Sequence, residues 1–410
     1  MNENARSVVV FTGLSHAIVH TFELSIPILV VIWLLEFPVT TATLGVVVSV
    51  GYALFGIGAL PGGVLADRFG SQTVILACLG GMGLAFLVLS FATGVVTIAL
   101  ALAVWGIAAS VYHPAGLSLI STSVEDRGTA FAYHGMAGNV GIALGPLVTA
   151  LLLLTFDWRI VTRLLVVPAI VAIGYAITAE FDEHAAVSVD GGTDESMSLS
   201  KFLADSRALF TVGFGLAMLI VMMNGLFYRG TLTFLPRVLG SFLPPITEYV
   251  SLFEAGSPLA SEFDLSSYLY VGLLGVGIGG QYVGGRVSDL IRPTTGLAVV
   301  FGSLVVVATG FVPAAQAGLV PLLIASAVLG FLLFALQPLY QATIAEHSPA
   351  GDRGLSYGYT YLTSFGVGAS GAAVAGYLLS VGSAGTTFAA LAAFPALGAI
   401  FALVLRRRSD

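Results

Sequence analysis

Three short motifs occur twice in this chain at nearly the same separation. Residues 63–70 read GVLADRFG and residues 285–292 read GRVSDLIR, so the second copy starts 222 positions later. The tripeptides at 112–114 (YHP) and 336–338 (LQP) form a second pair, and DRG at 126–128 and 352–354 forms a third. All six motifs lie in or beside long apolar runs. The sequence therefore indicates a duplicated membrane protein, and parallel duplicated halves are typical of transporters.

Composition excludes a soluble domain. The chain is 57% hydrophobic and only 9% charged, whereas soluble domains carry about 25% charged residues. Its 50 glycines suit helices that pack closely in lipid, where small side chains let backbones approach. The single cysteine, Cys78, allows no internal disulfide and no thiolate metal site. No cleavable leader is recognised, so we expect the first apolar segment to be retained.

Apolar runs of about 20 residues predict twelve transmembrane helices. The predicted spans cover residues 7–35, 41–66, 72–92, 96–121, 128–154 and 158–180, then 208–238, 266–288, 293–314, 318–344, 354–380 and 384–405. The predicted fold is therefore all-α and integral to the membrane, with two six-helix lobes related by a pseudo-two-fold axis. The lobes cover residues 1–182 and 208–410, and residues 183–207 form an acidic, flexible linker.

Basic residues predict the orientation. Of 15 lysines and arginines, 11 fall on one side of the predicted spans: Arg6, Arg68, Arg127, Lys201, Arg207, Arg286, Arg292, Arg353 and Arg406 to Arg408. Because cytoplasmic loops are enriched in such residues, this side is predicted to be cytoplasmic. We expect a plasma-membrane protein with both termini and the linker inside and a long external loop at roughly 239–265.

The span count, the acidic linker and the 63–70 loop resemble the major facilitator superfamily, and the resemblance covers nearly the whole chain. The chain departs from the family loop after Gly70, where Ser71 and Gln72 replace a basic pair. Residues 141–146 (GIALGP) are similar to the glycine-proline signature of the family's antiporters, although Thr149 and Ala150 replace its final glycines. The resemblance implies alternating access of two lobes around a midplane cavity.

Three segments look like the fosmidomycin-resistance-type branch of that family. They are the first-span pattern of His16, His20 and Glu23, the VYHP of residues 111–114 and the GNVG of residues 138–141. This resemblance implies proton-driven efflux of small molecules.

Glu23 is the first candidate for proton coupling. With His16 and His20 it lies at i, i+4 and i+7, on one face near the middle of the first span. Buried ionisable groups in a membrane need an explanation, and a carboxylate beside an imidazole can exchange protons near neutral pH. The alternatives are a fixed hydrogen bond to a neighbouring helix, or a divalent-metal site on the same three residues. We expect no metal and no cofactor.

Polar residues in other spans are candidates to line the substrate cavity. His113 precedes a mid-span proline, and Gln337 and Gln341 occupy the corresponding part of the tenth span. The alternative is that both prolines only kink their helices. Arg229 either faces the cavity, where it could bind an anion, or reaches the outer headgroups. The complete cavity set is Tyr112, His113, Asn224, Arg229, Gln337 and Gln341.

Glycine-rich segments are candidates for conformational change. His134, Gly138, Gly141 and Gly145 form one stripe on the fifth span, and glycines 272, 275, 279, 280 and 284 crowd the eighth. Close helix contact is the first interpretation of both. Since these spans meet across the lobe interface in the family, we expect the stripe to act as a gate. The conformational set is Gly63, Asp67, Arg68, Gly70, Gly141, Gly145, Pro146, Gly285, Asp289 and Arg292.

The sequence thus predicts a secondary transporter. We expect a monomer that exchanges protons for a small organic molecule and exports it. Uptake of an organic anion is an alternative, with Arg229 as counter-charge, and a membrane sensor or enzyme with a His/Glu metal site is another. No P-loop, nucleophile elbow, nucleic-acid signature or channel-type charge ring is recognised, so neither ATP hydrolysis, enzymatic catalysis nor nucleic-acid binding is expected.

Overall fold

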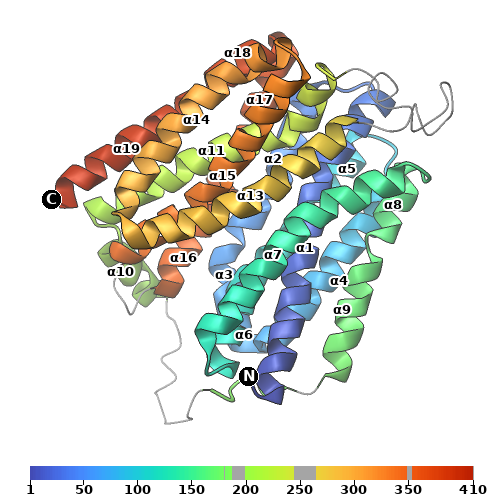
Figure 1. The fold of residues 1–410 in the computed structure, drawn as a ribbon. Helices are drawn as coiled ribbons and strands as arrows, with labels where there is room; N and C mark the ends of the chain where they lie inside the picture. Colours follow the sequence, from blue (N-terminus) through green and yellow to red (C-terminus); the bar gives the residue numbers. More distant parts are fainter. Residues whose placement is uncertain (180, 187–198, 244–264, 349–352, 410) are drawn as a thin grey trace.

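The computed structural model describes the chain except for residues 180, 187–198, 244–264, 349–352 and 410 (Figure 1). The described residues are almost entirely helical. In the first half the helices are α1 (Glu3–Glu36), α2 (Thr41–Ile57), α3 (Ala59–Phe69), α4 (Ser71–Leu89), α5 (Val95–Ser110), α6 (Tyr112–Ser123), α7 (Arg127–Leu153), α8 (Trp158–Leu164) and α9 (Val167–Thr178). The predicted external loop falls mostly outside the described residues.

The second half follows the same plan. Its helices are α10 (Leu199–Leu209), α11 (Val212–Gly240), α13 (Leu265–Leu290), α14 (Pro293–Gln316), α15 (Leu319–Glu346), α16 (Arg353–Tyr361), the π-helical η3 (Leu362–Val367), α17 (Ser370–Val381), α18 (Ala384–Leu391) and α19 (Ala393–Ser409). Residues 199–207, the last part of the predicted flexible linker, belong to α10.

Ten helical segments of the described chain are long and apolar enough to cross a membrane, or eleven if α2 and α3, which bend by 40°, count as one span. The remaining predicted span, the eighth at 266–288, coincides with α13, which is 26 residues long. Its glycines and its polar residues Gln281, Arg286 and Asp289 lower its hydropathy. The twelve-span prediction is thus supported in ten or eleven cases.

Four predicted spans are broken at a proline, and a fifth, 354–380, is divided into α16, η3 and α17 without one. Helices α2, α5, α8 and α18 end at Ile57, Ser110, Leu164 and Leu391, four residues before Pro61, Pro114, Pro168 and Pro395. A proline cannot donate to the carbonyl four residues earlier, and its ring collides with that carbonyl.

The duplication is visible as a repeated contact. A Cβ placed on Gly63 would lie 4.0 Å from Cβ of Pro114, and a Cβ placed on Gly285 would lie 3.9 Å from Cβ of Pro338. The GVLADRFG and GRVSDLIR motifs therefore pack against equivalent prolines in the two halves, although Pro338 lies inside α15 and does not break it.

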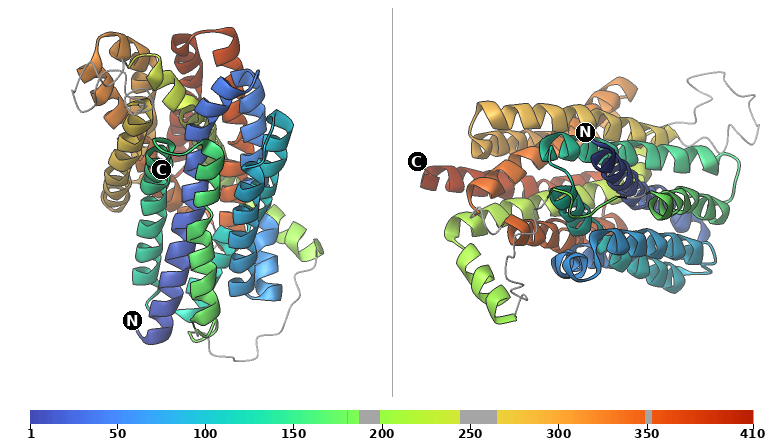
Figure 2. Two further views of the ribbon diagram at one scale, coloured as in Figure 1. Left: turned by 90° about the vertical axis from the view of Figure 1, so that its right-hand side faces the viewer. Right: turned by 90° about the horizontal axis from the view of Figure 1, so that it is seen from below.

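Helices of the two halves meet at several places. Helix α2 packs along α17 and η3, α7 packs against α13 (Figure 1), and α1 packs against α11. Ser49 fixes the first pair, because its hydroxyl donates to the carbonyl of Ala369 (2.7 Å) and accepts from the amide of Ala373 (2.9 Å). Both termini and α10 lie along the lower and left side of Figure 1, and two further views show the same bundle in Figure 2.

Candidate functional site

Pro27 shapes the centre of α1. It lies inside the helix, so the carbonyl of Glu23, four residues earlier, has no helical donor. The hydroxyl of Tyr52 on α2 donates to that carbonyl instead, at 3.2 Å. Glu23 itself is only 1% exposed. A buried carboxylate is costly unless it is paired and hydrogen-bonded, so the partners of Glu23 define the site.

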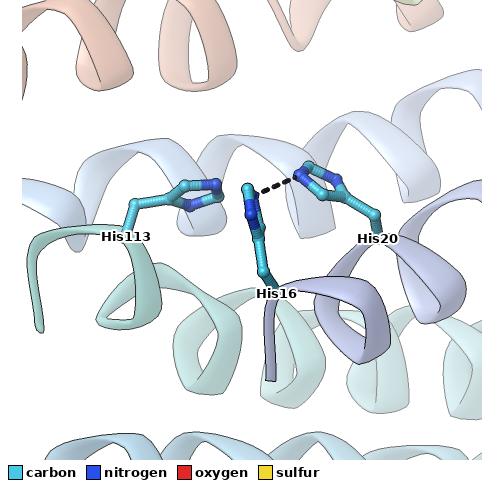
Figure 3. A group of neighbouring side chains, drawn as sticks. All are labelled: His16, His20 and His113. Carbon is cyan, nitrogen blue, oxygen red and sulfur yellow. Dashed lines mark hydrogen bonds between the residues drawn. The ribbon is translucent and has the colours of Figure 1, made fainter. Parts of the chain in front are cut away.

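One partner is a chain of histidines. Nδ1 of His20 lies 2.5 Å from Oε2 of Glu23, and Nε2 of His20 lies 3.0 Å from Nε2 of His16 (Figure 3). Nδ1 of His16 lies 2.8 Å from the carbonyl oxygen of His134 on α7. The i, i+4, i+7 spacing therefore does bring His16, His20 and Glu23 together, as the sequence predicts. The hydrogen bond that anchors this series of histidines to the carbonyl of His134 was not predicted.

The other partner comes from the second half. Nη2 of Arg229 on α11 donates to Oε1 of Glu23, and both side chains are almost completely buried. The guanidinium lies over the ring of Tyr52 at 3.9 Å and near that of Phe365 at 5.0 Å, within cation-π range. Of the two positions left open for Arg229, the structure therefore has the interior one. The two halves are joined here by a buried ion pair.

Imidazole and aromatic rings surround this network. Four of the six histidines gather here: the ring of His134 stacks on that of His16 at 4.1 Å, and the ring of His113 lies 5.3 Å from His16 and 5.7 Å from His20. His113 in turn lies 4.7 Å from Tyr361 of the second half. A proton can pass between titratable groups only where they are in contact. Within the described residues, this cluster is therefore the best candidate to bind a proton and pass it on.

The predicted cavity set is only partly assembled. Tyr112 is buried beside His16 and donates to the carbonyl of Thr12 at 2.5 Å. Gln337 accepts from Gln281 of α13 at 3.3 Å, and Gln341 is half-buried on α15. The second-half rings that lie against His113 are those of Tyr361 and Phe365 in the eleventh span, whereas Gln337 of the tenth span contacts Gln281.

Asn224 lies one turn before Arg229 on α11 and is buried. Its Oδ1 has no hydrogen-bond partner among the described residues, and neither has Nε of Arg229. Buried polar atoms of this kind usually find a partner, so these two atoms are candidates to contact a substrate. The sequence analysis missed Tyr52, Phe365 and Tyr361. An aromatic residue in an apolar span does not by itself indicate a functional site, and these three became candidates only because the fold places them beside Arg229 and His113.

The glycine stripe of α7 has a different partner from the one predicted. A Cβ on Gly138 would meet the ring of His16, one on Gly141 the backbone of Ala17, and one on Gly145 would lie 2.6 Å from Cα of Thr21. The expectation that Gly141 and Gly145 close against the eighth span is therefore wrong, since they pack α7 on α1 within the first half. In the eighth span, Gly280 and Gly284 pack on Phe331 and Ala335 of α15, whereas a Cβ on glycines 272, 275 or 279 would meet nothing within 4 Å. Pro146 lies inside α7 without ending it.

The first of the two duplicated loop motifs, at 63–70, is followed by an unexpected helix cap. Gly70 has φ +83°, which favours glycine, and starts α4. The carboxylate of Glu183 accepts from the amides of Ser71 (2.8 Å) and Gln72 (3.1 Å), the orphan donors of that helix. The guanidinium of Arg68 lies 5.3 Å from the ring of Phe69. The side chain of Asp67 lies outside the described residues, and Asp289 and Arg292 are exposed at the matching turn.

The histidines do not form a ready metal site. Ring nitrogens of His16, His20 and His113 lie within 4.8 Å of one another (Figure 3). Two ligand atoms bound at about 2.1 Å can be at most about 4.2 Å apart on one ion. At the full 4.8 Å a ring would have to move, and both oxygens of Glu23 already accept hydrogen bonds from His20 and Arg229. The arrangement fits a hydrogen-bonded chain better.

Comparisons with known proteins agree with this architecture. The Major Facilitator Superfamily model matches residues 11–372, and the chain therefore belongs to that family. An uncharacterized MFS-type transporter of Bacillus subtilis, YfnC, is 26% identical over 324 residues, which cover 77% of this chain and 72% of that protein. The chain is a multi-pass membrane transporter and not an enzyme.

A second relative matches a shorter segment. The puromycin resistance protein pur8 of Streptomyces alboniger is 38% identical over 108 residues, which cover 26% of this chain and 22% of that protein.

Solved structures share the fold at low identity. A mutant of the nucleoside transporter NupG has a TM-score of 0.76 at 12% identity, covering 98% of this chain and 99% of that chain. A bacterial homologue of the human lysosomal transporter Spinster has a TM-score of 0.73 at 13% identity, covering 99% and 98% of the two chains.

Proposed function

We propose that this chain is a proton-coupled antiporter that exports a small organic molecule, with Glu23, His20 and His16 as the coupling residues. The supporting observation is the buried network in which Glu23 binds a histidine of its own helix and an arginine of the other half. A proton or a substrate that changes this network changes the contact between α1 and α11. Alternating access requires such a contact to be made and broken.

The alternative of organic-anion uptake loses its motivating feature. It assigned Arg229 as a counter-charge for the substrate, but the guanidinium already binds Glu23. A cationic or neutral substrate that approaches Glu23, Asn224 and the surrounding rings suits the site better. The resemblance to the fosmidomycin-resistance-type branch and the puromycin resistance relative both favour export. The third alternative, a sensor or enzyme built on a metal, would require a ring of His16, His20 or His113 to move before all three could bind one ion.

We also propose a plasma-membrane location, with both termini and residues 183–207 in the cytoplasm between lobes 1–182 and 208–410. The functional unit is proposed to be a monomer, because the network lies within one chain.

Puromycin is the first substrate to test, because one relative is named for resistance to it. Cells that express the chain should accumulate less labelled puromycin than cells with an empty vector, and a protonophore should abolish the difference. The matched control is Glu36→Gln, which removes a carboxylate from the outer end of α1 and should export normally. Equal accumulation with and without the chain, for puromycin and for a panel of organic cations, would contradict export.

A further inference from the structure

The series of hydrogen bonds from Glu23 to His134 needs more protons than an ionised carboxylate and two neutral imidazoles carry. It has three links in series: Glu23 to His20, His20 to His16, and His16 to the His134 carbonyl. Each link needs one proton. An ionised carboxylate and two neutral imidazoles bring only two, because a neutral imidazole carries one N–H. All three links can exist together only if the chain holds one further proton.

The two ends of the chain restrict where that proton is. A carbonyl oxygen can only accept, so Nδ1 of His16 must carry a hydrogen. If Glu23 is ionised, Nδ1 of His20 must carry one as well. Both Nε2 atoms would then present lone pairs to each other at 3.0 Å. Two facing lone pairs at that distance repel, and a proton between them turns the repulsion into a hydrogen bond.

Arg229 favours an ionised Glu23. An arginine stays charged at any accessible pH, and here it donates directly to Oε1 while His20 binds Oε2. A free imidazole also holds a proton about a hundredfold more strongly than a free carboxyl group. Both considerations move the proton from the carboxylate to the imidazoles.

We propose that Nε2 of His16 and Nε2 of His20 share the excess proton, so that this imidazole pair, and not Glu23, is the proton-carrying group. Glu23 then serves as the permanent counter-ion of Arg229 and of the pair. This inference deepens the proposed function and rests on it only for the role of the proton in transport. The bound proton itself is a property of the resting protein.

Release of the proton would have a mechanical consequence. The two nitrogens could no longer stay 3.0 Å apart, so at least one ring has to turn. The ring of His113 contacts both imidazoles, and Tyr361 of the second half contacts His113. A ring movement at His16 or His20 is therefore passed to the α16–η3 segment.

The titratable and charged groups around the pair come from six elements. Glu23 lies on α1 itself, Tyr52 on α2, Arg229 on α11 and Tyr361 on α16. From α6 and α7 the pair faces Tyr112, His113 and His134. His113 and His134 are also titratable, so the test has to separate them from the pair.

The experiment uses the purified full chain in liposomes, labelled with ¹⁵N in the histidine rings, and needs no substrate. The signals of the pair are assigned by their loss in His16→Asn and His20→Asn. At neutral pH we expect three protonated nitrogens among the four of these two rings and a correlation between the two Nε2 atoms. In a direct proton-binding titration, each of these variants should bind one proton fewer than wild type.

Two matched variants separate the pair from its neighbours. His134→Phe keeps the backbone carbonyl that accepts from His16 and keeps a ring stacked on it. His113→Phe keeps a ring between the pair and Tyr361. Both should retain the shared-proton signals. His347, whose Nδ1 lies 2.9 Å from the carbonyl of Thr343, serves as the reference for a histidine outside the cluster.

Three results would overturn the proposal. The first is an infrared band of a protonated carboxyl group that disappears in Glu23→Gln, with His20 protonated only at Nε2. The second is two neutral rings throughout the mildly acidic to neutral range. The third is a stoichiometric transition metal in the purified protein with both Nε2 signals shifted by it. If the proton signals appear but no transport is coupled to protons, the proposed function fails while this assignment stands.

Discussion

At the residue scale, the contact between Glu23 and Arg229 joins the two halves of the chain inside the proposed coupling site. The sequence predicted that Glu23, His16 and His20 share one helix face, because this follows from helical spacing alone. It left the position of Arg229 open. That position depends on how α11 packs on α1, between residues more than 200 positions apart in the chain. No local pattern contains such information.

A double-mutant cycle should show that Glu23 and Arg229 contribute to stability mainly through their contact with each other. Glu23→Gln leaves Arg229 as an unpaired buried charge, and Arg229→Gln does the same to Glu23. Each single change should cost about 3–5 kcal/mol of stability, and the double change should cost less than the sum. Thermal unfolding of the purified variants in detergent provides the measurement.

The control is the pair of Glu36 and Arg159, whose atoms approach to 2.7 Å but whose side chains are about a third exposed. Glu36→Gln should cost at most about 1 kcal/mol. Additive effects of Glu23→Gln and Arg229→Gln would mean that the two side chains do not depend on each other.

At the element scale, proline explains much of the difference between predicted and observed helices. In four spans the first helix ends four residues before a proline, so these breaks could have been predicted from the sequence. Yet Pro27, Pro146 and Pro338 lie inside continuous helices. At Pro27 the freed carbonyl finds Tyr52 as a donor. Whether a proline breaks a helix thus depends on tertiary partners that the local sequence does not contain.

The glycines of α7 should tolerate bulk according to what they face. Gly141→Leu would drive a side chain into the backbone of Ala17 and should lower stability by about 1–3 kcal/mol or prevent folding. Gly135→Leu, on the same helix but with nothing within 4 Å of its Cβ position, is the matched control and should fold like wild type. Folded yield and unfolding temperature in detergent measure both. Equal tolerance of the two changes would show that α7 does not pack closely on α1.

The contribution of the Glu183 cap to α4 gives a second prediction at this scale. Glu183→Ala removes the acceptor of the Ser71 and Gln72 amides. Loss of a helix cap costs about 1 kcal/mol, so hydrogen exchange at these two amides should accelerate by roughly fivefold. Glu125→Ala, which removes an exposed carboxylate between α6 and α7, should leave the exchange of α4 unchanged. Unchanged protection in Glu183→Ala would contradict the cap.

At the scale of the whole molecule, the duplication was the most informative part of the sequence. The same glycine–proline contact occurs in both halves, at 4.0 and 3.9 Å. The expected gate between the fifth and eighth spans shows the limit of such inference. The helices do meet, but the glycines face α1 instead, because a stripe on a helix indicates close packing without saying which neighbour it packs on.

Topology gives a prediction for the complete bundle. In a Cys78→Ala background, a cysteine at Asp205 of α10 should react with a membrane-impermeant maleimide only after the cells are opened. A cysteine at Thr93, between α4 and α5, should react in intact cells. Cys78 is buried and its removal should not disturb the fold. Labelling of the Asp205 position from outside would reverse the proposed orientation.

The central claim is that substrate and proton move in opposite directions through one buried network. The most direct measurement follows the internal pH of liposomes that contain the purified protein when puromycin is added outside. Antiport predicts that the lumen becomes alkaline as puromycin enters, and that this change disappears in His20→Asn but persists in His134→Phe. Acidification of the lumen, or puromycin entry with no pH change, would contradict the account.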